Sequence, residues 1–225
     1  KSSQKGALKE ALSDKRVWAL FLIYGACFGI ELTINNIAAI YYHDFFDLNL
    51  KTAGLIAGLF GLMNLFARSL GGFFGDKAGI KWGLRGRVAF LGIVLLIEGI
   101  ALVVFSQMTI LPLAIGSMVV FSLFVQMAEG ATFSVVPFIN KKAIGMVSGI
   151  VGAGGNVGAV MAGFLFKMEG LSYSQALSIM GIAVTAVSAC SLIIRFSNVD
   201  ESVAKEELDK SLEHKAALQA EMVRS

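Results

Sequence analysis

Charged residues are scarce in this 225-residue chain, where Asp, Glu, Lys and Arg make up only 16% of the sequence. Soluble domains carry about 25% charged residues. Hydrophobic residues make up 56% of this chain, which is more than the roughly 45–50% of soluble domains. The few charges cluster, which leaves long stretches almost uncharged and is typical of a membrane protein. The net charge of +3 is small and by itself says nothing about nucleic acid. For a membrane protein we expect no nucleic-acid partner.

Cysteine and histidine are also rare, with two of each. Cys27 and Cys190 lie in apolar stretches, and no Cys/His spacing indicates a metal site or a disulfide framework. We expect two small buried side chains there, and neither a metal nor a cofactor. A nucleophile–base pair and a Walker-type loop are lacking as well, because residues 152–158 have no Lys-Ser/Thr ending. The sequence therefore predicts that the protein is not an enzyme and has no catalytic residues.

Six apolar stretches are long enough to cross a membrane, which takes about 20 helical residues. They are residues 17–42, 53–75, 87–106, 110–135, 144–166 and 174–196. We therefore expect an all-α membrane protein whose six transmembrane helices form one bundle over residues 17–196. Residues 1–16 would precede it as a cytoplasmic linker. Residues 197–225, with charges of both signs, would follow as a cytoplasmic tail, either a solvated helix, a frayed end or a partner-binding helix.

Basic residues alternate between the expected loops. They gather before the first stretch, between the second and third, and between the fourth and fifth, whereas the other loops carry few. By the positive-inside rule both termini lie in the cytoplasm. The basic residues on that side are Lys1, Lys5, Lys9, Lys15, Arg16, Lys77, Lys81, Arg85, Arg87, Lys141 and Lys142.

Arg68 stands out because it lies deep in the second apolar stretch, well before Asp76 at the cytoplasmic end. At 1.5 Å per helical residue the separation is about 12 Å, which places Arg68 near the middle of the membrane. A central arginine costs about 2.5–3.5 kcal/mol on the milder insertion scale, so it should face a polar cavity or a partner. We consider an anion-binding role and an ion pair with Glu98 or Glu31.

Four residues of the first stretch share one helical face, because their spacings are four, three and four. They are Tyr24, Phe28, Glu31 and Asn35. A stripe with aromatic rings, a carboxyl and an amide should not face lipid, so we expect it to line the same cavity as Arg68. Hydrogen bonds that merely hold the bundle together are the alternative. Glu31 is the only carboxyl on this face.

Glycine is abundant in the fifth stretch, although each interior glycine costs a helix roughly 1 kcal/mol relative to alanine. Rows of small residues let helix backbones approach closely, but packing alone requires one row. We expect one row to pack and another to make room for a small solute, with Asn156 as a hydrogen-bond donor. The rows are Gly145, Gly149 and Ala153; Gly154 and Gly158; and Ser148, Gly152 and Asn156.

The sequence GGFFGDKAGIK, residues 71–81, resembles the loop motif G-x-x-x-D-[RK]-x-G-x-[RK] of the major facilitator superfamily. In that superfamily the motif joins the second and third helices of each six-helix half, and here it joins the second and third apolar stretches. The matching residues are Gly72, Asp76, Lys77, Gly79 and Lys81.

A more specific resemblance involves GATFSVVPF and GMVSGIVGAGGNVGA, which are similar to the nitrate signature of the nitrate/nitrite porter family. The segments FLIYGACFGIELTINNIAAIYYHDFF and GLFGLMNLFARSLGGFFGD resemble the first two helices of the C-terminal half of eukaryotic-type high-affinity nitrate transporters. The resemblance implies that the chain is the C-terminal half, helices seven to twelve, of a twelve-helix transporter. Residues 1–16 would then link the two halves.

The resemblance also implies a substrate site and a mechanism. Arg68 matches the arginine of the C-terminal half, Tyr24 and Phe28 match aromatic residues around the anion, and Asn156 matches the signature together with Gly154 and Gly155. A planar guanidinium suits a planar, trigonal anion, because it offers parallel N–H donors. The expected function is secondary active transport of nitrate and nitrite for nitrate assimilation, by alternating access and proton symport, with Glu31 as the proton-coupling residue.

The implied partners are nitrate or nitrite, protons, an N-terminal six-helix half, the lipid bilayer of the plasma membrane and, for some members, an accessory membrane protein. Two other functions stay open at this point. The chain could belong to a transporter of another small anion or organic acid in the same superfamily, or it could be a six-helix membrane subunit that does not transport.

Overall fold

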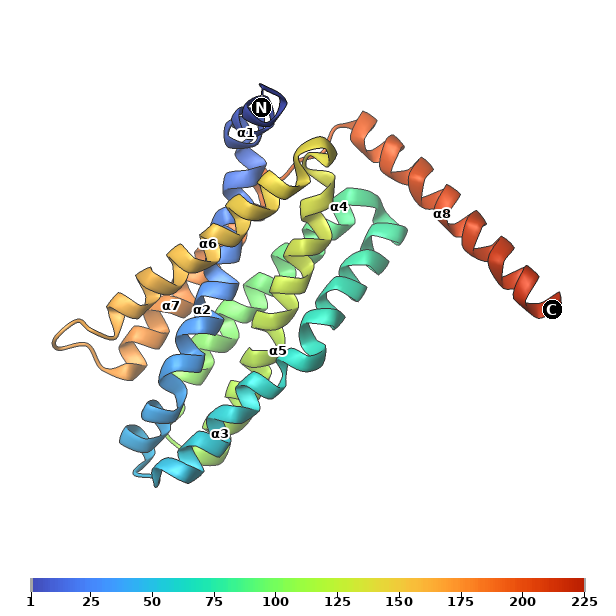
Figure 1. Cartoon of the computed structure of the whole chain (residues 1–225). Helices are drawn as coiled ribbons and strands as arrows, with labels where there is room; N and C mark the ends of the chain where they lie inside the picture. The colour runs from blue at the N-terminus through green and yellow to red at the C-terminus, as the bar shows by residue number, and fades with distance from the viewer. Residues whose placement is uncertain (1, 225) are drawn as a thin grey trace.

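The computed structural model describes residues 2–224, with side chains for residues 6–211 and 213, and this part of the chain consists of helices joined by turns and loops (Figure 1). Lys1 and Ser225, the ends of the expected linker and tail, lie outside the described residues, as do the side chains of Lys5 and His214. The α-helices are α1 (Ser2–Ser13), α2 (Lys15–Phe46), α3 (Leu50–Leu62), α4 (Asn64–Ser106), α5 (Leu111–Val135), α6 (Ile144–Leu165), α7 (Tyr173–Ser188) and α8 (Asn198–Arg224). Short 3₁₀ helices cover Val136–Phe138, Lys141–Ala143 and Ala189–Ile193.

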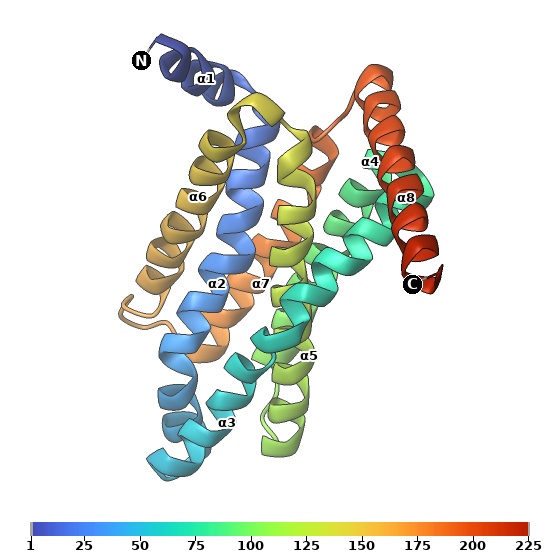
Figure 2. The same ribbon diagram turned by 45° about the vertical axis from the view of Figure 1, so that its right-hand side comes forward.

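Helices α2 to α7 pack side by side into an elongated bundle, and α1 and α8 project from one end of it (Figures 1 and 2). Five helical segments in the described residues are long and apolar enough to cross a membrane. The sequence predicted six, and the difference arises because residues 53–75 and 87–106 fall in one 57-residue segment, Leu50–Ser106. The segments are Lys15–Phe46, Leu50–Ser106, Leu111–Phe138, Lys141–Leu165 and Tyr173–Ile193.

The segment Leu50–Ser106 reverses direction at Gly83, inside α4 (Figure 1). Gly83 has φ 71° and ψ −163°, a backbone conformation that residues with a Cβ rarely adopt. On either side of it the two parts of α4 lie against each other, with Gly79 beside the Arg87 side chain. Glu201 of α8 accepts hydrogen bonds from the backbone N–H groups of Leu84 at 2.8 Å and Arg85 at 3.0 Å. This carboxylate therefore caps the first N–H groups of the second part of α4.

Glycines hold α2 and α6 in close contact. A Cβ at Gly154 would collide with the backbone of Phe21, and a Cβ at Gly158 would collide with the backbone of Gly25. This row therefore packs, as small residues at a helix crossing allow. A Cβ at Gly145, Gly149 or Gly152 would meet no atom within 4 Å. These three glycines face away from the packed side of α6.

A second close crossing joins α4 to α5 and positions the candidate site. A Cβ at Gly71 would collide with the backbone of Met127, and a Cβ at Gly130 would collide with the backbone of Arg68. The two helices therefore touch through bare backbone at this point. The crossing places Arg68 of α4 next to Glu129 of α5.

The two ends of the bundle differ in charge. At one end the Arg16 guanidinium donates to the carbonyl of Ile139 at 3.2 Å, and Lys141 pairs with Glu207 of α8. At the other end the Tyr173 hydroxyl donates to Asp44 at 3.1 Å. Among the residues whose side chains are described, the first end carries the basic residues that the sequence assigned to one side of the membrane. Of the two cysteines expected to be buried, Cys27 is buried and Cys190 is partly exposed.

Candidate functional site

Arg68 lies one turn after the start of α4, and 40% of its side chain is exposed on the surface of the bundle. Its Nη2 atom lies 3.2 Å from Oε2 of Glu31 on α2, and it also forms an ion pair with Glu129 on α5. Both carboxylates are withdrawn from water, because 4% of the Glu31 side chain and 0% of the Glu129 side chain are exposed. Three helices therefore meet at one guanidinium.

Glu31, Glu129 and Arg68 differ in how many hydrogen-bond partners their polar atoms have. Asn64, at the start of α4, donates from Nδ2 to Oε1 of Glu31 at 2.8 Å. Apart from the ion pair with Arg68, no described residue donates a hydrogen bond to either oxygen of Glu129. The buried Nε of Arg68 likewise has no hydrogen-bond partner among the described residues. The guanidinium therefore has a free donor while its Nη2 serves two acids.

Aromatic rings cover one side of Arg68. The centre of its guanidinium lies 5.7 Å from the centroid of the Phe28 ring, within the range of a cation–π contact. Tyr24 stacks on Phe28 with 5.1 Å between centroids and 6° between planes. Of the stripe expected on α2, Phe28 and Glu31 therefore touch Arg68, Tyr24 reaches it through Phe28, and Asn35 is exposed one turn further along.

The signature residues of α6 fall on different faces. A Cβ at Gly155 would lie 2.5 Å from Cδ1 of Phe28 and 3.1 Å from two ring atoms of Tyr24, so this glycine leaves space for the rings. Gly154 instead packs against the backbone of α2. Asn156 is exposed, and its Nδ2 donates to the carbonyl of Gly152 within the same helix at 3.4 Å.

The ion-pair partners expected for Arg68 were Glu31 or Glu98, and the structure pairs it with Glu31 and Glu129. Glu98 is fully buried, and both of its oxygens lack a hydrogen-bond partner among the described residues. Sequence reasoning missed Glu129. The available signal was a lone carboxyl inside the apolar stretch 110–135, which is as costly there as Arg68 is in its own stretch.

The site combines one permanent cation with two acids, an aromatic wall and a glycine surface. A guanidinium binds flat anions through parallel N–H groups. With both carboxylates ionised, however, the site carries one excess negative charge. An anion can bind Arg68 only in competition with these acids.

The loop-motif residues form a separate cluster at the end of the bundle. Asp76 pairs with Arg87, which also donates to the carbonyl of Ser134 at 3.3 Å and lies 4.8 Å from the centroid of the Phe138 ring. Gly79 makes room for the Arg87 side chain. A Cβ at Gly72 would lie 3.9 Å from the carbonyl of Gly130, and Lys77 and Lys81 lie over aromatic rings, 4.5 Å from Phe73 and 4.6 Å from Trp82.

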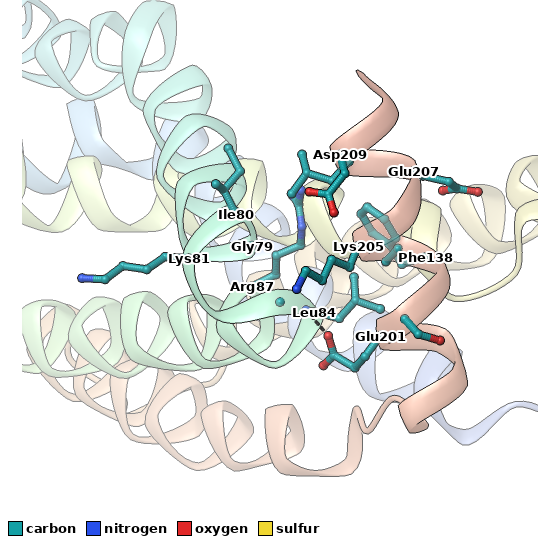
Figure 3. Close-up of a pocket in the computed structure, with 14 residues that line it drawn as sticks. Gly79, Ile80, Lys81, Leu84, Arg87, Phe138, Glu201, Lys205, Glu207 and Asp209 are labelled. Atoms are coloured by element: carbon teal, nitrogen blue, oxygen red, sulfur yellow. Dashed lines mark hydrogen bonds between the residues drawn. The ribbon is translucent and has the colours of Figure 1, made fainter. Parts of the chain in front are cut away.

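A pocket of about 530 Å³ opens between this cluster and α8 (Figure 3). Arg87 and Phe138 form one wall, and Glu201, Lys205 and Asp209 of α8 form the other. Its lining charges are of both signs, so it has no preference for an anion. The pocket lies at the turn of α4 and does not include Arg68.

The chain is also similar in sequence to known proteins. Residues 1–163 match the family model of the Major Facilitator Superfamily. The chain is 46% identical over 187 residues to high affinity nitrate transporter 2.5 of Arabidopsis thaliana, and the match covers 83% of this chain and 37% of that protein. It is 41% identical over 199 residues to high-affinity nitrate transporter 2.3 of Oryza sativa subsp. japonica, and this match covers 87% of this chain and 38% of that protein.

A third relative, the nitrate/nitrite transporter NrtP of Picosynechococcus sp., is 37% identical over 148 residues, which cover 64% of this chain and 27% of that protein. The chain thus spans less than two fifths of the length of these relatives. The expected resemblance to high-affinity nitrate transporters is confirmed, and the family points to a transporter and not to an enzyme. Since the family model covers more than half of its residues, the chain belongs to the Major Facilitator Superfamily.

Proposed function

We propose that the chain is the C-terminal half of a secondary transporter that carries nitrate, and also nitrite, across a membrane by alternating access. The observation that carries this proposal is the Arg68 guanidinium. It is partly exposed on the side of the bundle, touches the Phe28 ring and has an unpartnered Nε. Relatives named as nitrate transporters supply the substrate class.

The geometry suits nitrate for physical reasons. Nitrate is flat and spreads one negative charge over three oxygens, so it can accept parallel hydrogen bonds from one edge of Arg68. Phe28 and Tyr24 form an aromatic wall beside Arg68, and Gly155 leaves these rings their space. In this proposal Gly154 supports the site through packing, and Asn156 approaches the anion from the exposed face of α6 in the complete transporter.

The proposed architecture counts six membrane crossings over residues 17–196. The segment Leu50–Ser106 supplies two of them, because 57 residues exceed the length of one crossing and the chain reverses at Gly83. The exposed face around Arg68 would pack against an N-terminal six-helix half, with the substrate at the interface, as in transporters built from two repeats. Residues 1–16 would be the linker between halves and residues 197–225 a tail.

The basic end of the bundle would face the cytoplasm, which places both termini there, and the membrane would be the plasma membrane. Loop-motif residues from Gly72 to Lys81 would secure the turn between the second and third crossings through the pair of Asp76 with Arg87. Proton symport is part of the proposal, and the sequence assigns the coupling to Glu31. An accessory membrane protein stays a prediction.

Uptake by the full-length transporter in proteoliposomes tests the function. We expect labelled nitrate to accumulate when the outside is acidified, and nitrite to compete better than small organic acids do. The variant Arg68→Gln should abolish accumulation because the cation is lost. Arg85→Gln is the matched control, since Arg85 is an exposed arginine of the same helix at the other side of Gly83. Normal nitrate uptake by Arg68→Gln, or equal competition by an organic acid, would contradict the proposal.

A further inference from the structure

The two carboxylates at Arg68 are held differently. Glu31 has a partner for each oxygen, with Asn64 Nδ2 at 2.8 Å from one and Arg68 Nη2 at 3.2 Å from the other. Glu129 depends on Arg68 alone, because its side chain is 0% exposed and no other described residue donates to it. A ligand that draws the guanidinium away therefore leaves Glu129 without a partner, whereas Glu31 keeps its hydrogen bond from the amide of Asn64.

A carboxylate stranded in a low-dielectric interior is costly, and such a group becomes neutral by binding a proton. We infer that Glu129 is the proton-binding residue of the Arg68 site: an incoming anion displaces the Glu129 carboxylate from the guanidinium, and the displaced carboxylate takes up one proton. This inference rests on the proposed function. It assigns the proton to Glu129, where the sequence alone pointed to Glu31.

The exchange balances in charge and in atoms. Before binding, the guanidinium contributes one positive charge and the two carboxylates two negative charges. After binding, the anion has replaced the charge of Glu129, which is now a neutral carboxylic acid with its new O–H bond. The proton comes from water on the side to which the site is open, and Arg68 keeps its own protons because a guanidinium is not deprotonated in proteins. The net charge of the site is the same in both states, so anion and proton travel as a neutral pair.

The surroundings offer Glu129 no substitute for Arg68. On α5 its neighbours one turn away are Gln126, which donates to the carbonyl of Phe60 at 3.0 Å, and Thr132, which donates to its own helix at 2.8 Å. Other titratable or charged groups of the helices packed against this part of α5 are Arg68, Tyr24, Cys27, Glu31 and Glu98. Among these groups Arg68 is the only cation.

Isothermal titration calorimetry of the purified full-length transporter with nitrate tests the inference. Titrations in buffers of different ionisation enthalpy give the number of protons taken up for each nitrate bound. For the wild type we expect about one proton, with nitrate affinity falling about tenfold for each pH unit over the range in which binding takes up that proton. Glu129→Gln mimics the protonated acid, so its proton count should fall to about zero and its nitrate affinity should become independent of pH.

Two further variants make the assignment specific. Glu31→Gln should keep a proton count of about one, because Glu129 is still present. Glu98→Gln is the matched control, a buried carboxyl whose described contacts do not include Arg68, and it should keep both the proton count and the pH slope. A Glu129→Gln variant that still takes up one proton would overturn the inference, and so would a Glu31→Gln variant that takes up none.

The test also separates this inference from the proposed function. If the wild type binds nitrate without any proton uptake, the assignment to Glu129 is wrong while the function stands. If the wild type does not bind nitrate, the proposed function itself is wrong. If the Glu129→Gln protein does not fold or cannot be purified, the Glu31→Gln measurement still decides, because in that variant Glu129 is the only carboxylate left at Arg68.

Discussion

Two arginines of α4, Arg68 and Arg87, lie on either side of the turn at Gly83 and have opposite surroundings. Arg87 meets one carboxylate, Asp76, whose side chain is 62% exposed, and it adds a backbone carbonyl and an aromatic ring. Arg68 meets two carboxylates that water does not reach, and its Nε is left without a partner. The Arg87 cluster pairs one cation with one carboxylate, and its contacts hold the helices together. The Arg68 cluster instead holds one cation between two buried carboxylates, and in our account it binds an anion together with a proton.

The largest effect that this comparison predicts is on nitrate affinity in the full-length transporter. Arg68→Lys keeps the charge but loses the planar pair of N–H donors, and hydrogen bonds between charged groups contribute about 1.5–3 kcal/mol. We therefore expect nitrate affinity to fall by about ten- to a hundred-fold. Arg87→Lys should keep the affinity and instead lower the melting temperature of the purified protein. Equal losses of affinity in both variants would remove the distinction between the two clusters.

A stability effect of about 1–3 kcal/mol is expected where α4 crosses α5, because overpacking a tight contact costs that much. Gly130→Ala pushes a methyl group against the backbone of Arg68, so abundance in the membrane and nitrate uptake should both fall. Gly116→Ala on the same helix meets no atom within 4 Å and should be neutral or stabilising. Fluorescence-detected size-exclusion chromatography measures the abundance. Wild-type behaviour of Gly130→Ala would show that the crossing does not position Arg68.

Two adjacent glycines of α6 should separate packing from substrate binding. Gly154→Ala meets rigid backbone of α2, and we expect it to lower the amount of folded protein. Gly155→Ala meets the rings of Phe28 and Tyr24, which can move. The folded protein should then stay near its normal amount while nitrate uptake falls several-fold. If Gly155→Ala transports as well as the wild type at equal abundance, the aromatic wall is not part of the site.

The smallest effect is expected for Asn156→Ala. Its side chain is exposed and bonds within its own helix, so abundance should not change. A loss of one neutral hydrogen bond to the anion is worth about 1 kcal/mol, which corresponds to an increase of about fivefold in the nitrate concentration for half-maximal uptake. An unchanged uptake curve would exclude Asn156 from the site.

The sequence alone predicted the apolar helical segments, because apolar runs report burial in lipid or protein directly, but the structure has residues 53–75 and 87–106 in one segment. It also placed Phe28 and Glu31 near Arg68, since residues three and four apart share a helical face. The sequence marks Glu129 only as a lone carboxyl in an apolar stretch. Its contact with Arg68 could not be predicted, because this contact depends on how Gly71 and Gly130 set the crossing of α4 and α5. The same limit applies to Asn156, since glycines on several faces of α6 gave no sign of which face packs.

The most direct test of the central claim is a structure of the full-length transporter with nitrate bound. We expect the anion to lie at the N–H edge of the Arg68 guanidinium, beside the Phe28 ring, with Glu129 moved off the guanidinium and Glu31 still held by Asn64. Nitrate bound elsewhere, with Arg68 paired to both Glu31 and Glu129, would contradict the account.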